Sequence, residues 1–310
     1  MHAWFRCAAP AAAMLLATSV ASRSQQPTFR SGVDVVTVDV SASRGGEHID
    51  GLREGSFEVF DNGAQQKIDR VTLEQVPLEA YLLFDVSGSI AGAKLQQLQN
   101  AANAFANGLT PQDKVALITF AQKVDVRQSL TGDFEAFQRA VSEITAGGQT
   151  ALYDATLHTI GLRHHNDNRA VLVVLTDEGD NASETSQKQV IEAAERSDVI
   201  AYGVLAAEQG AGVGGGMGRG MGFRPPQVQF QIGFLRSLAE ATGGRVFRTT
   251  SRLRLDDAFA LVLDDARARY VLTFRPTNPA PGWHKLHVRL VGAKGDVVAR
   301  RGYFVGGESK

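Results

Sequence analysis

Hydrophobic and polar residues follow two different periods along the chain, and the change of period divides it into three parts. From about residue 28 to residue 74, apolar and polar residues alternate, as in 36–41, which is typical of strands with one buried face. Between residues 78 and 265, short aliphatic runs are separated by segments whose apolar residues recur every three or four positions. Beyond residue 266 the strand-like alternation returns. The pattern predicts β structure at both ends and α/β structure between them.

The middle part is expected to fold as an open, doubly wound, mostly parallel sheet with helices on both faces. The run 170–175 is almost continuously aliphatic, which is typical of a central parallel strand that is covered on both sides. The run 81–84 predicts a second buried strand. Further strands are expected at 114–120, 124–130, 199–205 and 245–248, and helices around 95–109, 134–144, 152–159, 187–197, 230–242 and 255–263.

Each terminal β region is too small to enclose a core alone. In residues 28–77, Asn62-Gly63 lies between two strand-like runs, which is a strong signal for a hairpin. Residues 266–306 add β-rich runs at 269–274, 285–290 and 297–305. We therefore expect one small β-sandwich built from 28–77 and 266–306, with residues 78–265 inserted into it. Two separate β subdomains are the alternative.

Composition and charge narrow the class of protein. The chain has 310 residues, 44% hydrophobic and 21% charged, which is ordinary for a soluble globular protein long enough for two domains. Its formal net charge of −1 gives no reason to expect a nucleic acid as partner.

The first 21 residues predict a secretory signal peptide. Arg6 precedes an apolar, alanine-rich run that ends in the small-x-small sequence Ser19-Val20-Ala21. An uncleaved anchor is less favoured, because the run falls short of the roughly 20 apolar residues that a membrane span requires. The single cysteine, Cys7, lies within this segment, so the mature chain would have no disulfide. We expect a secreted or periplasmic protein with no membrane span in the mature chain.

Oxygen-bearing side chains occur in three segments of the middle part. The first is Asp85-Val86-Ser87-Gly88-Ser89 after a predicted strand, the second is 147–155 with Thr150, and the third is 175–180 with Asp177. Loops that leave the carboxyl ends of parallel strands are where ligands bind. The donors include no imidazole or thiolate, which favours Mg²⁺ first and Mn²⁺ next. The first segment alone is more often a helix N-cap than a metal site, so the prediction depends on all three.

Together the three segments resemble the metal-ion-dependent adhesion site of von Willebrand factor A-type (VWA) domains, with its D-x-S-x-S…T…D pattern. The core resemblance covers residues 78–265. The flanking runs 33–40, 51–57 and 300–304 are similar to the bacterial VWFA-related domain family named from acidobacterial proteins.

This resemblance implies direct coordination by the hydroxyls and direct or water-mediated coordination by the carboxylates. The implied metal ligands are Asp85, Ser87, Ser89, Thr150 and Asp177. A bound Mg²⁺ (or Mn²⁺) would then accept an Asp or Glu side chain from a protein partner. In the third segment Glu178 stands where many relatives have glycine. As a third carboxylate it would weaken the attraction of the ion for that partner.

The expected function is therefore an extracytoplasmic protein-binding module and not an enzyme. One alternative is a metal-dependent hydrolase that uses the same ion to activate water, with Glu178 or Asp180 as the base. It is less favoured because no nucleophile, base and orienting group converge in the sequence. Another alternative is a metal-free scaffold with a degenerate site.

Two further patterns carry less weight. The glycine-rich segment 210–222 contains G-x-G-x-x-G spacings without a strand–turn–helix context, so it predicts a mobile loop between residues 205 and 230. A loop that borders the metal face and contributes to the choice of partner is the less favoured alternative. The pair His164-His165 predicts surface residues and not metal ligands, because adjacent residues on a helix do not share a face.

Overall fold

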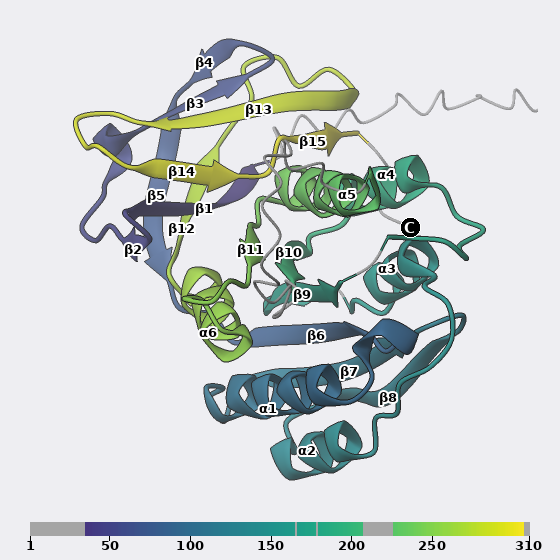
Figure 1. Cartoon of the computed structure of the whole chain (residues 1–310). Helices are drawn as coiled ribbons and strands as arrows, with labels where there is room; N and C mark the ends of the chain where they lie inside the picture. Colours follow the sequence, from purple (N-terminus) through teal and green to yellow (C-terminus); the bar gives the residue numbers. More distant parts are fainter. Residues whose placement is uncertain (1–34, 165, 178, 207–225, 307–310) are drawn as a thin grey trace, which may run out of the picture. The chain divides into compact units, whose positions relative to one another are not determined.

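A six-stranded sheet forms the centre of the structure (Figure 1), a computed structural model that describes residues 35–164, 166–177, 179–206 and 226–306. Its strand order is β11-β10-β9-β6-β7-β8. The strands are β6 (Leu78–Asp85), β7 (Lys114–Phe120), β8 (Val124–Thr131), β9 (Arg169–Thr176), β10 (Ile200–Leu205) and β11 (Val246–Arg248). All neighbours pair in parallel except β7 and β8, which are antiparallel. The mostly parallel α/β sheet that the sequence predicted is therefore confirmed.

Four predictions from the sequence concern residues outside the described ones. These are the signal peptide at residues 1–21, the glycine-rich segment 210–222, and the residues His165 and Glu178.

Helices cover both faces of this sheet (Figure 1). One face packs against α1 (Ala93–Asn107), α2 (Phe134–Ser142) and α6 (Leu255–Arg267), and the other against α3 (Leu152–Gly161), α4 (Gln187–Arg196) and α5 (Pro226–Thr242). Every residue of β6 and β9 is buried, which explains why these strands are almost continuously apolar in the sequence. The two central strands therefore hold the loops that follow them in fixed positions.

Two antiparallel sheets are formed by the remaining strands. The first has the order β14-β1-β12-β5, with β2 paired to β1, and the second has the order β15-β13-β3-β4. The strands are β1 (Val36–Arg44), β2 (Glu47–His48), β3 (Phe57–Asp61), β4 (Ala64–Gln66), β5 (Ile68–Glu74), β12 (Arg269–Phe274), β13 (Gly282–Leu290), β14 (Asp296–Ala299) and β15 (Gly302–Val305), and two short 3₁₀ helices lie at η1 (Glu54–Ser56) and η2 (Gly88–Ile90).

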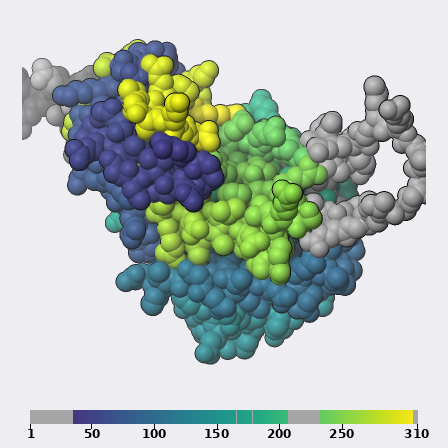
Figure 2. All heavy atoms as spheres, turned by 60° about the vertical axis from the view of Figure 1, so that its left-hand side comes forward, coloured from purple at the N-terminus to yellow at the C-terminus, as the bar shows by residue number. Residues whose placement is uncertain are grey.

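Both ends of the described chain contribute strands to each of these sheets. In Figure 2 the purple and yellow segments lie side by side, as the pairing of β1 with β12 and β14 requires. One apolar cluster joins the two sheets, with Val40 and Leu272 from the first and Val59 and Val288 from the second.

The predicted β-rich run 297–305 does form β structure, but not as one continuous strand. It is divided into β14, which pairs with β1, and β15, which pairs with β13. Arg300 lies at the division, where its side chain donates to the backbone oxygens of Glu195 at 2.6 Å and Ser197 at 3.1 Å. Because this side chain is bonded to the end of α4, the chain bends there, and local alternation in the sequence carries no sign of such a distant contact.

Gly244 allows two backbone segments to approach each other closely. A Cβ atom at this position would lie 1.9 Å from the backbone oxygen of Ala201 in β10. We expect Gly244→Ala to lower the free energy of unfolding by about 3 kcal/mol or more, because backbone must move to relieve the overlap. At Gly161, the last residue of α3, a Cβ would meet nothing within 4 Å, so Gly161→Ala should not destabilise. Urea unfolding followed by circular dichroism measures both, and equal stability of the two variants would contradict the packing argument.

His284 is buried in the second antiparallel sheet between two acceptors. Its Nδ1 lies 2.8 Å from Oδ1 of Asp61, and its Nε2 lies 2.7 Å from the backbone oxygen of Ala280. Because both partners are acceptors, both ring nitrogens must donate, which requires the protonated imidazolium. Burial alone would lower the pKa of His284, but the hydrogen bonds to Ala280 and Asp61 and the charge of Asp61 outweigh it and raise the pKa.

This raised pKa predicts a pH-dependent stability. A histidine whose pKa is higher in the folded than in the unfolded protein stabilises fully below the unfolded value of about 6.5. The contribution is lost as the pH rises through the folded pKa. We expect the free energy of unfolding to fall above pH 6.5 in the wild-type protein and to fall less steeply in His284→Gln. Urea titrations across this pH range measure the difference, and superimposable pH profiles would show that His284 is not charged in the fold.

Candidate functional site

Asp85 is the last residue of β6, and its carboxylate is fixed from two sides. Oδ1 accepts a hydrogen bond from the backbone nitrogen of Ser87 at 2.9 Å, and Oδ2 accepts one from Oγ1 of Thr176 at 2.6 Å. Thr176 ends the neighbouring strand β9, so this carboxylate joins the first and third predicted loops. The Asp85 side chain is fully buried.

A chain of polar contacts continues from the first loop to the third. The hydroxyl oxygens of Ser87 and Ser89 lie 3.1 Å apart, and Ser89 Oγ donates to Oδ1 of Asp177 at 2.8 Å. The other carboxylate oxygen of Asp177 accepts from Nζ of Lys94 at 2.6 Å. Four of the five residues predicted from the sequence therefore lie within one connected group.

The second loop reaches this group through backbone hydrogen bonds. The backbone nitrogen of Gly88 donates to the oxygen of Gly148 at 3.2 Å, and that of Gly147 donates to the oxygen of Val86 at 2.7 Å. Thr150, which is fully buried, exchanges hydrogen bonds of 2.9 Å with Asn181 through its backbone nitrogen and oxygen. The loop with Thr150 is thus bonded to both the first and the third loop. We call Asp85, Ser87, Ser89, Thr150 and Asp177 together the three-loop site.

The electrostatics of the three-loop site favour a cation. Burial raises the pKa of Asp85, hydrogen bonds from Ser87 and Thr176 oppose the rise, and the charge of Asp177 adds to it. The side chain of Asp177 is only 4% exposed. Two buried carboxylates and three hydroxyls provide oxygen donors alone, which is a donor set that Mg²⁺ accepts. A cation placed between them would offset the cost of burying the charges.

Three residues at this site were not predicted from the sequence. Thr176 and Asn181 hold Asp85 and Thr150, and Lys94 contacts Asp177. Lys94 lies nine positions after Asp85 in the sequence, and no local pattern links it to a residue in the third loop. The contact joins the first turn of α1 to the residue that directly follows β9.

Asp180, one candidate base for the hydrolase alternative, is turned towards α3. Its Oδ1 accepts from the backbone nitrogen of Tyr153 at 3.2 Å and from the hydroxyl of Ser183. It therefore holds the first turn of α3, so Glu178 remains as the candidate base of the hydrolase hypothesis. In the part of the chain that the structure describes, no group of three or more His, Cys, Asp or Glu residues could hold a metal. A metal at the three-loop site would depend on hydroxyls as well.

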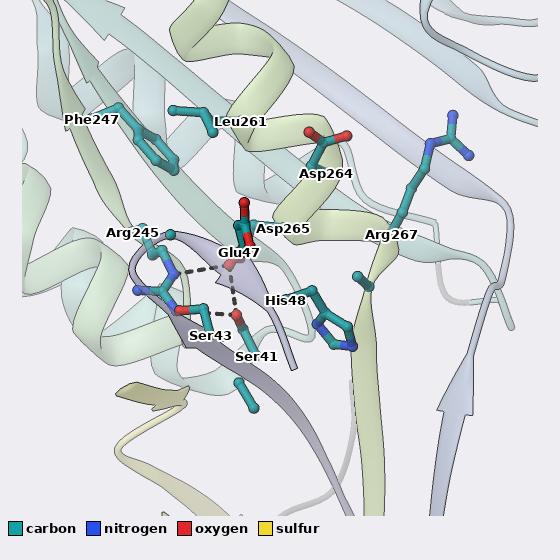
Figure 3. A pocket seen from close by; sticks show the side chains of 13 residues that line it. Ser41, Ser43, Glu47, His48, Arg245, Phe247, Leu261, Asp264, Asp265 and Arg267 are labelled. Carbon is teal, nitrogen blue, oxygen red and sulfur yellow. Dashed lines mark hydrogen bonds and ion pairs between the residues drawn. The ribbon is translucent and has the colours of Figure 1, made fainter. Parts of the chain in front are cut away.

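A pocket of about 590 Å³ lies beside β1 and α6, apart from the three-loop site in the sequence (Figure 3). Arg245 in its wall donates to Asp265 at 2.8 Å and to the hydroxyls of Ser41 and Ser43 at 3.1 and 3.0 Å. These groups satisfy one another, as is typical of a structural network, so the three-loop site remains the better candidate for ligand binding.

Comparison with known proteins matches the same region of the chain. The model of the von Willebrand factor type A domain family matches residues 81–180, which include all five residues of the three-loop site. The chain contains a VWA domain. A solved structure of a von Willebrand factor type A protein from Catenulispora acidiphila has a TM-score of 0.51 at 13% identity, covers 83% of this chain and 76% of its own, and shares the fold of the VWA domain.

Two curated relatives each match about half of this chain and a much smaller share of their own length. The mouse inter alpha-trypsin inhibitor heavy chain 4 is 28% identical over 178 residues, which is 53% of this chain and 18% of the relative. The pig inter-alpha-trypsin inhibitor heavy chain H4 is 26% identical over 180 residues, which is 54% and 19%. The chain thus spans about a fifth of these relatives. VWA domains are typically protein-interaction modules and not enzymes.

Proposed function

We propose that the VWA domain binds Mg²⁺ (or Mn²⁺) at the three-loop site and captures an acidic side chain of a protein partner through that ion. The observation that carries this proposal is the polar chain from Ser87 through Ser89 to Asp177, beside the buried carboxylate of Asp85. Ser89 of the first loop contacts Asp177 of the third, and the second loop, which contains Thr150, is joined to the first by backbone hydrogen bonds. The first segment alone would be explained by helix capping, but neither serine hydroxyl caps the helix that follows.

The charge of the donor set supports an adhesive role for the ion. Two carboxylates, Asp85 and Asp177, would balance the charge of a divalent cation without exceeding it, so a further carboxylate would meet no excess of negative charge at the ion. Mg²⁺ usually keeps several waters and binds through one or two protein carboxylates, and one such water can be replaced by a ligand oxygen. The partner is therefore a protein that offers Asp or Glu.

The proposal also covers the segments on either side of the VWA domain. We infer that the strands at 28–77 and 266–306 form one β-sandwich around the insert at 78–265, as in the VWFA-related family named from acidobacterial proteins. The pairing of β1 with β12 and β14 supports this division. With residues 1–21 as a signal peptide, the protein would be secreted or periplasmic. No described helix is long and apolar enough to cross a membrane.

Isothermal titration with MgCl₂ and with MnCl₂, followed by a pull-down from an extracytoplasmic fraction with Mg²⁺ or with EDTA, tests the proposal. The expected result is saturable binding of the cation and a set of captured proteins that is lost in EDTA. A protein that binds neither cation at millimolar concentration would be the metal-free scaffold. Partners that remain bound in EDTA would show that the surface binds without the ion.

A further inference from the structure

Lys94 places a positive charge on one of the proposed metal ligands. Its Nζ lies 2.6 Å from Oδ2 of Asp177, while Oδ1 of the same carboxylate accepts from Ser89. The Lys94 side chain is 34% exposed and that of Asp177 is 4% exposed. The ion pair therefore lies at the rim of the three-loop site, with its negative partner buried and its positive partner in contact with solvent.

The stability of α1 does not explain the position of Lys94. It is the second residue of α1, where the helix dipole presents partial positive charge and a cation is unfavourable. The first turn of α1 contains no acidic residue that would offset this charge. The described contact that accounts for a lysine here is the one with Asp177. Lys94 thus interacts with Asp177 at the three-loop site, although its charge slightly destabilises the start of α1.

A buried carboxylate requires a compensating charge, and Lys94 supplies one to Asp177 from within the chain. A divalent cation that approaches Asp177 meets this ammonium group a few ångströms away, and like charges at such a distance repel strongly when partly shielded from water. The cation must therefore overcome the repulsion or displace the side chain, which its flexible stem and partial exposure permit.

We propose that Lys94 is an internal counter-cation that competes with the divalent ion for Asp177 and so sets the ion concentration at which the three-loop site fills. This inference rests on the proposed metal-binding function. In the absence of the divalent ion, Lys94 keeps the buried carboxylate compensated. When the ion enters, the ammonium group gives up its contact with Asp177 and lies free at the rim.

The test compares Mg²⁺ binding by isothermal titration in four proteins: wild type, Lys94→Met, Lys94→Arg and Lys188→Met. Lys188 belongs to an exposed pair with Glu192 on α4, so its replacement removes the same charge from a side chain whose described ion pair is with Glu192 and not with the three-loop site. We expect Lys94→Met to bind Mg²⁺ at least about tenfold more tightly, because the repulsion is removed. Lys94→Arg, which keeps the charge, and Lys188→Met should stay within about threefold of wild type.

Thermal unfolding provides a second readout that does not depend on a partner protein. In EDTA, Lys94→Met should melt at a lower temperature than wild type, because Asp177 keeps its hydrogen bond from Ser89 but is left buried without a compensating positive charge. Added Mg²⁺ should raise its melting temperature more than it raises that of wild type. Lys94→Gln, a neutral polar replacement, should repeat both effects and serves as the second variant if the methionine variant folds poorly.

The outcomes separate this inference from the proposed function. If wild type binds Mg²⁺ and the neutral variants bind it equally or more weakly, Lys94 is not a competitor, although the metal site stands. If no protein in the series binds Mg²⁺, the metal site and the role of Lys94 both fail. Tighter binding in Lys188→Met as well would assign the effect to overall charge and overturn the inference.

Discussion

Asp85→Ala is expected to weaken Mg²⁺ binding at least about a hundredfold and to remove cation-dependent capture of a partner. The carboxylate is fully buried and fixed by Ser87 and Thr176, so the substitution removes a charged ligand that is already held in place. Its removal also leaves Asp177 as the one remaining carboxylate of the three-loop site. A doubly charged ion would then have too little negative charge to replace its hydration shell. Titration with MgCl₂ measures the effect directly.

Two companion variants make this result interpretable. Asp85→Asn keeps the shape of the side chain and an acceptor for Thr176 but removes the charge, so it should lose Mg²⁺ with less effect on stability. Asp50→Ala removes a carboxylate that is 84% exposed and remote from the three-loop site in the sequence, and should bind Mg²⁺ as wild type does. Unchanged affinity in Asp85→Asn would place the ion elsewhere and end the adhesion-site hypothesis.

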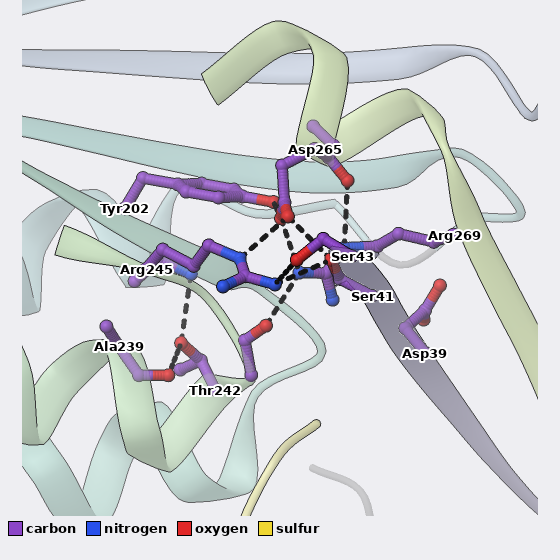
Figure 4. A network of polar contacts seen from close by, with 12 residues as sticks. Asp39, Ser41, Ser43, Tyr202, Ala239, Thr242, Arg245, Asp265 and Arg269 are labelled. Atoms are coloured by element: carbon purple, nitrogen blue, oxygen red, sulfur yellow. Dashed lines mark hydrogen bonds and ion pairs between the residues drawn. The ribbon is translucent and has the colours of Figure 1, made fainter. Parts of the chain in front are cut away.

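Arg269→Met is expected to lower the free energy of unfolding by about 3–5 kcal/mol, because it breaks a buried ion pair at one partner. Arg269 is fully buried, and its Nη2 donates to Oδ2 of Asp265 at 2.9 Å and to the backbone oxygen of Gly243 at 2.7 Å (Figure 4). Asp265 also accepts from Ser41 at 2.6 Å and from Tyr202 at 2.6 Å.

The state of Asp265 explains the size of the effect. Burial would raise the pKa of Asp265, but the charge of Arg269, the hydrogen bonds from Ser41 and Tyr202 and the charge of Arg245 hold it well below its usual range. Without Arg269 this ionised carboxylate stays buried with less compensation. Arg275→Met, which breaks an exposed pair with Asp69, should cost no more than about 1 kcal/mol. Urea unfolding at neutral pH compares the two, and similar losses would show that the Arg269 network adds little stability.

Sequence reasoning succeeded where the cause of the structure is local. The aliphatic run 170–175 became β9, which is buried along its whole length. Asn62 and Gly63, with φ of 48° and 85°, form the turn between β3 and β4 that their residue types predict. Asp85 ends one recognisable strand and Asp177 directly follows another, and polar contacts connect the two through Ser87 and Ser89. That these residues bind a metal stays a prediction.

Sequence reasoning failed where the cause lies far away along the chain. The bend at Arg300 depends on carbonyl groups at the end of α4, more than 100 residues earlier. The bond between Ser41 and Asp265 joins residues 224 positions apart, and the contact of Lys94 with Asp177 joins residues 83 apart. Hydrophobic periodicity reports on neighbours within one helix or strand, so it contains no information about such pairs.

The register of β5 and β12 places Glu74 directly opposite Arg269. The α/β part therefore begins just after Glu74 and ends just before Arg269, and these two residues are cross-strand partners. A segment of almost 200 residues can be accommodated this way without forcing apart the strands that carry it, because its two ends are joined in the same ladder. The paired strands β5 and β12 would accommodate a different inserted domain in the same way. The present insert would likewise fit between two paired strands of another protein.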